Sequence, residues 1–263
     1  MILRRIREHV THHNWFAVAV DFIIVVIGVF VGIQASNWNQ ARVDRQQARE
    51  YRAMLRGDLD ANIESLATRK RYYEWVRSEA LATLAELDRP SASLDEQFLV
   101  HAYQATQILP WSLKRNTYDE ILSVGATANL GDPTLRDEVA NYYVSSEVTS
   151  ANISTVPPYR DIVRRIMPYA AQQAIRAHCN ERIFQADRGR TNIVLPTGPC
   201  RLGLDPTTVQ QAVAQVHDWP GLRLDLNRLL VDLDQKLFSV GGISARANSL
   251  KAALKKVDGQ RQS

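Results

Sequence analysis

We predict that this chain of 263 residues is all-α, with one N-terminal transmembrane helix that continues into a long helix and is followed by an extramembrane helical bundle. Residues 16–33 form an apolar run long enough to cross a bilayer. From 34 to 89 there is no proline, and apolar residues recur every three or four positions, which is the helical period. Strand signals are scarce, and "TNIVLP" at 191–196 is the one short run that favours a strand.

The predicted boundaries are a cytoplasmic flank at 1–14, a transmembrane helix at 15–38, an extracytoplasmic helical domain at 39–258 and a tail at 259–263. Some 220 residues outside the membrane are enough to bury a core without a metal or cofactor. The net charge of +4 is spread along the chain, with arginines and acids interleaved. Because no basic face is clustered, we expect no nucleic-acid partner.

Insertion of the apolar run into a membrane is energetically favourable despite its one acid. Thirteen of its 18 residues are Ile, Val or Phe, and together they contribute about −6 kcal/mol against about +3 kcal/mol for a central aspartate. Trp15 and Trp38 bracket the run as interface anchors. A cleaved signal peptide would also show "RRIR" before an apolar run, but Ile33 fits poorly at position −3 of a cleavage site ending at Ala35. A soluble core helix is the third interpretation.

The acid shares one face of the predicted helix with small and polar residues. At 100° per residue, Asp21, Gly28, Gly32, Ala35 and Asn39 fall close to one meridian. Gly28 and Gly32 form a G-x-x-x-G pattern that lets two helix backbones approach closely. A carboxylate prefers a partner helix to lipid, so this face predicts a homo-oligomer formed through the span. The alternative is that Asp21 is wetted by the headgroup region.

Two segments carry a family resemblance. Asp21 followed by "IIVVIGVFVGIQASNWN", and "NTYDEILSVGATANLGDPTLRDEVANYY" at 116–143, resemble an uncharacterised family of bacterial single-span membrane proteins, a domain of unknown function. The family has Glu at the position of Asp21 and Asn-Asn-Trp-Asn-Glu where this chain has "SNWNQ" at 36–40. The resemblance implies a single-span bacterial membrane protein. It implies no activity, substrate or catalytic residue.

Capping residues and prolines divide the rest of the chain into helices. The long helix is expected to run to about residue 88, with a bend near Gly57. The further expected starts are Ser93 with Glu96 as a capping box, Asn116 or Thr117, Asp132-Pro133, Pro158 with a kink at Pro168, Asp205-Pro206, and Asp218-Trp219-Pro220, with Gly241-Gly242 weakening the last helix.

The segment 179–204 lacks helical period and is bounded by the only two cysteines. Long irregular connections are usually functional or tied down. A Cys179–Cys200 disulfide would close it and contribute about 3 kcal/mol; structural free cysteines and a reactive thiol are the alternatives. Arg188 and Arg190 in "DRGRT" are a possible anion-binding loop, and a solvated loop is the plainer interpretation.

No pattern of residues predicts catalysis, a cofactor or a metal site. His9, His12 and His13 lie about one helical turn apart but have no acid or cysteine at ligand spacing, which favours an exposed interfacial cluster. His178 next to Cys179 suggests a base with a nucleophile, although neighbours on a helix point about 100° apart. Phosphate-binding, hydrolase-elbow and zinc-protease motifs do not occur in the sequence.

The charges that flank the apolar run do not decide by themselves which side of the membrane holds the domain. Arginines at 4, 5 and 7 precede the run and those at 42, 45, 49 and 52 follow it, so the count slightly favours the opposite orientation. Long domains translocate largely regardless of charge, and structural disulfides persist in oxidising compartments. We therefore expect a cytoplasmic N-terminus and a periplasmic domain on the bacterial inner membrane. The expected role is non-catalytic binding of a protein partner or small ligand; an enzyme, or an accessory subunit of a membrane complex, with a site near 179–204 is the alternative.

Overall fold

The computed structural model describes residues 15–109, 112–186 and 190–260, and within them the prediction of an all-α chain is confirmed. The helices are α2 Trp15–Glu86, α3 Glu96–Gln104, α4 Asn116–Ser123, α5 Pro133–Ser154, α6 Pro158–Ile166, α7 Tyr169–His178, α8 Pro206–His217 and α9 Leu222–Gln260, with short 3-10 helices η1 Ser91–Ser93 and η2 Ala126–Asn129. Among these described residues the only sheet is a two-stranded one, β1 Arg182–Ala186 and β2 Arg190–Val194.

The chain divides into two compact units, residues 1–52 and 53–263. In the first, the described residues belong to α2, and its side chains from Phe22 to Ile33 are exposed. This helix is long and apolar enough to cross a membrane, and its most apolar window is not buried within the chain. A core helix of a soluble protein would be buried, so that interpretation of the run is not supported.

In the second unit, α2 buries one side with a regular alternation of four and three residues. Nine buried positions follow this alternation, Leu55, Leu59, Asn62, Leu66, Arg69, Tyr73, Val76, Ala80 and Thr83, and Tyr72 beside Tyr73 is buried as well. This is a heptad repeat, in which a seam of period 3.5 stays on one side of the helix over many turns. We call these nine residues the α2 seam. The apolar residues Ile63 and Leu84 lie outside this alternation and are only half-buried.

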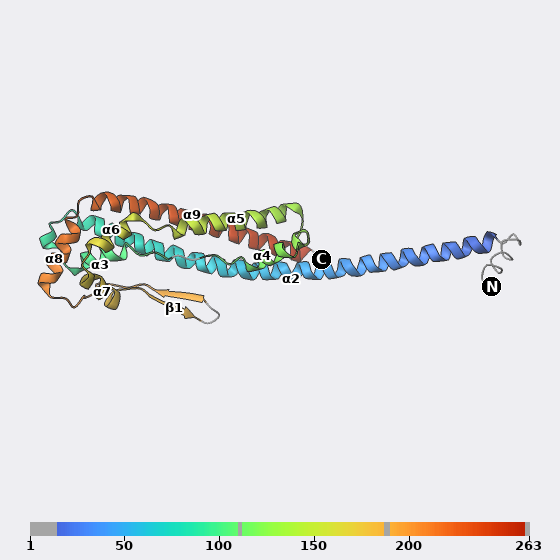
Figure 1. Cartoon of the computed structure of the whole chain (residues 1–263), viewed down its shortest axis with the longest axis horizontal. Coiled ribbons are helices and arrows are strands. Elements are labelled where there is room, and N and C mark those ends of the chain that lie inside the picture. The colour runs from blue at the N-terminus through green and yellow to red at the C-terminus, as the bar shows by residue number, and fades with distance from the viewer. Residues whose placement is uncertain (1–14, 110–111, 187–189, 261–263) are drawn as a thin grey trace. The chain divides into compact units, whose positions relative to one another are not determined.

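Helix α9 packs along α5, and Figure 1 shows the two running side by side. Its buried stripe includes Leu226, Leu229 and Leu233, and it continues to Leu254. The helix is not interrupted at Gly241-Gly242, where the sequence predicts a weaker helix. Val240 and Ile243, on either side of the glycine pair, are buried, and this packing outweighs the low helix propensity of glycine.

A lysine lies inside the α9 stripe. Lys236 is 3% exposed, and its ammonium donates to the carbonyl oxygens of Ile153 (3.0 Å) and Thr155 (2.6 Å) at the C-terminal end of α5. Its Nζ also lies 5.4 Å from the centre of the Tyr73 ring. Burial lowers the pKa of Lys236 to about 8. The side chain thus satisfies carbonyls that the end of α5 leaves without helical partners.

Two predicted helix starts are confirmed by their capping bonds. The Asp132 carboxylate accepts from the Leu135 amide (2.9 Å), and Asp205 accepts from the Thr208 amide (2.9 Å), with proline in the first turn of each helix. In both, an aspartate at the N-cap is followed by a proline at the first helical position, a common sequence for a helix start.

Two other expected capping residues and one expected kink are wrong. Asp95, not Ser93, caps α3, because Ser93 belongs to a 3-10 turn. At α4 the Thr117 amide donates to Asp58 of α2 (3.2 Å), so the cap comes from another helix. Pro168 ends one helix rather than kinking it, because it cannot donate a backbone hydrogen bond, and α7 begins after it.

Candidate functional site: the disulfide-closed hairpin

The structure joins Cys179 to Cys200 by a disulfide, which confirms the predicted pairing and excludes a reactive thiol there. Their Cα atoms lie 5.7 Å apart across a sequence separation of 21. The enclosed segment forms no helix among its described residues, in keeping with its lack of helical period, but it is not irregular. β1 and β2 form an antiparallel hairpin in which Ile183 faces Ile193. The "TNIVLP" run does form most of β2, whereas the run at 182–186 has no alternation of apolar and polar residues that would predict a strand.

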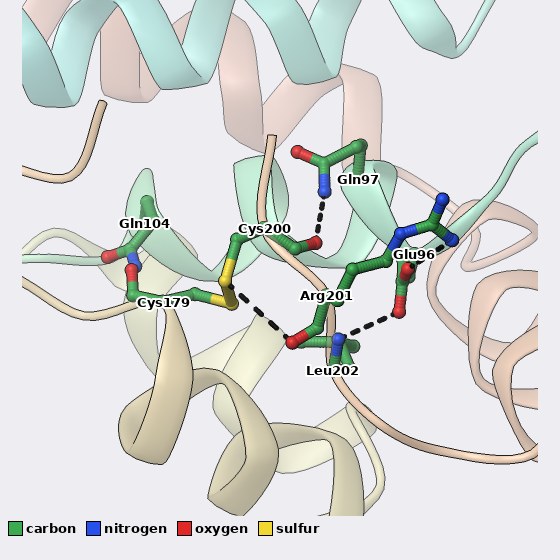
Figure 2. The surroundings of a disulfide bond; sticks show 7 residues. All are labelled: Glu96, Gln97, Gln104, Cys179, Cys200, Arg201 and Leu202. Atoms are coloured by element: carbon green, nitrogen blue, oxygen red, sulfur yellow. Dashed lines mark hydrogen bonds and ion pairs between the residues drawn. A yellow bond between two sulfur atoms is a disulfide. The ribbon is translucent and has the colours of Figure 1, made fainter. Parts of the chain in front are cut away.

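Helix α3 holds both ends of the disulfide-closed segment (Figure 2). Gln104 donates to the Cys179 carbonyl (2.6 Å), and Gln97 donates to the Cys200 carbonyl. The two glutamines are seven positions apart, and two helical turns bring them to the same face of α3. Glu96 adds a third contact, since its carboxylate accepts from the Leu202 amide (2.8 Å). We call Glu96, Gln97 and Gln104 the α3 clamp.

Beneath Cys179, polar side chains from four segments form a connected network. The Gln107 amide donates to Asn180 (2.7 Å) and Glu181 (3.2 Å), and its oxygen accepts from Arg164 Nη2 (3.0 Å). Tyr72 of α2 donates to the other carboxylate oxygen of Glu181 (3.2 Å). The residues that follow Cys179 are therefore bound to α2, to α6 and to the segment after α3 through side chains that satisfy one another.

Burial sets the charge behaviour of this network. It raises the pKa of Glu181 and of the Tyr72 hydroxyl, and it lowers the pKa of Arg164. The Arg164 guanidinium lies 4.7 Å from the centre of the Tyr103 ring and donates through Nε to the Thr106 hydroxyl (3.0 Å). These groups bind one another, and the arrangement is suited to bracing the hairpin base.

The hairpin itself exposes apolar side chains. Ile183, Phe184 and Val194 are 53%, 48% and 44% exposed. β1 and β2 pair chiefly with each other, and Figure 1 shows the hairpin to one side of the helices. Each strand therefore leaves its outer edge of backbone N–H and C=O groups without a neighbouring strand of this chain, among the residues that the structure describes. Exposed edges with apolar side chains are surfaces that proteins use to bind other chains.

The predicted anion-binding loop is not tested by these contacts. Arg188 lies outside the described residues, and Arg190 begins β2 without a described side chain. Near the disulfide, Arg201 pairs instead with Glu96 of the clamp (3.2 Å). The hypothesis that His178 activates Cys179 is wrong, because the sulfur is bonded to Cys200.

The predicted span residues lie on one continuous helix, α2. Trp15 and Trp38 are 77% and 66% exposed. A side chain built at Gly28 or Gly32 would meet no atom within 4 Å, so this chain leaves their face open. Asp21, Ala35 and Asn39 are exposed as well. Pairing through this face stays a prediction.

Sequence reasoning also missed a titratable pair that no motif marks. His101 of α3 lies 2.6 Å from the Glu79 carboxylate of α2, and that hydrogen bond raises the pKa of His101. Burial raises the pKa of nearby Glu86. The described residues contain no group of three His, Cys, Asp or Glu side chains placed to hold a metal ion. His9, His12 and His13 lie outside the described ranges.

No family model, curated protein or solved structure matches this chain. The family resemblance of the span and of 116–143 is therefore untested, and the arrangement of the described residues is what bears on function.

We predict that replacing both cysteines, Cys179→Ser with Cys200→Ser, lowers the free energy of unfolding by about 3 kcal/mol, the loop-entropy contribution of a disulfide over this separation. Amide exchange in β1 and β2 should accelerate more than exchange in α5 or α9, because the hairpin base loses its covalent closure. Chemical denaturation and hydrogen exchange of the full chain measure both effects. Unchanged hairpin exchange would mean that the α3 clamp alone holds the segment.

Proposed function

We propose that this chain is a membrane-tethered helical module of the bacterial cell envelope that binds a protein partner through its disulfide-closed hairpin and performs no catalysis. The observation that carries the proposal is the hairpin: an arm with exposed Ile183, Phe184 and Val194 on a base fixed by a disulfide and the α3 clamp.

An isolated two-stranded hairpin is marginally stable in water, so a chain keeps one exposed only where its base is held. Here the base is held covalently and by hydrogen bonds from α3. Pre-organisation of a binding segment reduces the ordering entropy lost on association. A partner that adds a strand to a hairpin edge and covers Phe184 would satisfy both the backbone groups and the apolar side chains.

The runner-up, an enzyme with a site near 179–204, is less well supported. Glu181 is a half-buried acid, but its two oxygens accept from Tyr72 and Gln107. A cavity lies between α4, η2 and α5, and none of its lining residues belongs to the polar network around Glu181. An accessory subunit of a membrane complex remains compatible with the proposal, since such a subunit also binds a partner.

Placement in the inner membrane is part of the proposal. It is supported by the exposed apolar segment of α2 and by the disulfide, which fits an oxidising compartment. The bilayer would then cover residues 15–38, and the domain would lie in the periplasm.

Photo-crosslinking in native membranes tests the hairpin. A photoreactive residue replacing Phe184 should give a discrete adduct with one protein, whereas the same residue replacing Val148, an equally apolar and 67% exposed position on α5, should not. The Cys179→Ser, Cys200→Ser variant should lose most of the Phe184 adduct. Equal labelling from both positions, or none from Phe184, would contradict partner binding by the hairpin.

Fusion reporters at the C-terminus test the topology. Alkaline phosphatase should be active and a green fluorescent reporter dark, because the domain is expected outside the cytoplasm. The reverse pattern would place it in the cytoplasm. An N-terminus beginning at Ser36 or Asn37 in the mature protein would instead show that the segment is a cleaved signal.

Self-association through the membrane-spanning part of α2 can be tested by comparing two pairs of substitutions in that helix. Gly28→Ile with Gly32→Ile should weaken self-association in a membrane two-hybrid assay, because bulk on this face separates the backbones. Val29→Ile with Val31→Ile adds volume on other faces and should leave the signal unchanged. If the two pairs behave alike, the small-residue face does not mediate pairing.

A further inference from the structure

A cavity of about 330 Å³ lies between α4, η2 and the first two turns of α5. Its lining residues are Tyr118, Leu122, Thr127, Leu130, Pro133, Arg136, Asp137 and Ala140. The volume is at the small end of the range for ligand pockets, which suits a molecule of metabolite size. None of these residues takes part in the hairpin or its base.

Most of the lining is apolar, and one wall is fixed. The Tyr118 ring stacks on Tyr143 with centroids 4.3 Å apart and planes 3° from parallel. Leu122, which lines the cavity, and Val124, two residues further along, are 47% and 58% exposed. The cavity therefore offers a rigid aromatic wall and an uncovered apolar one.

One charge of each sign completes the lining. Arg136 is half-buried, and its Nε atom is buried with no hydrogen-bond partner among the described residues. A buried N–H without an acceptor is unfavourable, and an acceptor supplied by a ligand would remove that penalty. Asp137 is the neighbouring residue on α5, about 100° further around the helix, and it is exposed. A guanidinium and a carboxylate thus flank an apolar surface.

We propose that this cavity binds a small zwitterion with an apolar side chain, in chemical terms a free hydrophobic α-amino acid. Its carboxylate accepts from Arg136, its ammonium donates to Asp137, and its side chain packs against Leu122 and Leu130. A simple organic anion would match Arg136 but would meet the like charge of Asp137. A simple amine would match Asp137 and leave the Arg136 Nε atom without an acceptor.

Titration calorimetry of the full-length protein in nanodiscs tests the proposal with three probes. L-Leucine should bind, while 4-methylpentanoate, which lacks the ammonium, and 3-methylbutan-1-amine, which lacks the carboxylate, should each bind at least about tenfold more weakly, as expected for loss of one charge-assisted hydrogen bond. Absence of leucine binding at millimolar concentration would overturn the proposal.

Charge-neutral variants assign the two ends of the ligand. Arg136→Gln should weaken leucine binding about tenfold and abolish the preference for leucine over 3-methylbutan-1-amine. Asp137→Asn should also weaken leucine binding about tenfold, and it should abolish the preference for leucine over 4-methylpentanoate. Glu138→Gln and Arg165→Gln, exposed residues outside the lining, are the matched controls and should bind leucine normally.

Equal binding by all four variants, or 4-methylpentanoate as good a ligand as leucine, would overturn the assignment. Asp137→Asn changes an exposed residue, so we expect its thermal unfolding to be unchanged. A loss of leucine binding in that variant is then not a loss of the fold. The photo-crosslink from Phe184 does not depend on this cavity, so each proposal can fail without the other.

Discussion

The α2 seam is the constraint on which the fold of the second unit, residues 53–263, depends. Nine buried positions, from Leu55 to Thr83, repeat with a period of 3.5 residues and so stay on one side of the helix for eight intervals. Helices α5 and α9 pack along each other over much of their length, and α3 packs against α6, α7 and α8. A seam of this length supplies the continuous, mostly apolar side that a helical domain needs, because most helical stability in proteins comes from packing.

Polar side chains within the buried surfaces join the helices at defined points. Asn62 of the seam donates to the Lys114 carbonyl (2.9 Å) and to the Tyr142 hydroxyl (3.1 Å), and it accepts from the Lys114 amide (2.7 Å). Lys236 binds the end of α5 in the same way from α9. A buried polar group is stable only where its partners are present, so each such contact favours one alignment of the helices over shifted ones.

The hairpin is the one described element that the helical packing does not explain. Its position follows from α3, whose two glutamines, one heptad apart, bind the carbonyls at both disulfide cysteines. A rigid base and an exposed apolar arm are what a binding segment requires. The same helix carries His101, paired with Glu79, so α3 connects the core of the domain to the surface that we propose binds a partner.

The sequence by itself determined the helical class, the apolar segment of α2, the aspartate caps at Asp132 and Asp205, and the Cys179–Cys200 pairing, because each depends on local periodicity, local capping or a unique pair of residues. Tertiary structure alone decided the seam membership of Asn62 and Thr83, the burial of Lys236 and the cap that Asp58 gives α4. The hydrophobic pattern of a sequence predicts that polar residues are exposed. Their burial becomes favourable only where a partner far along the chain forms a hydrogen bond with them. The hairpin, its clamp and the cavity at Arg136 also join segments distant in sequence, so local patterns could not predict them.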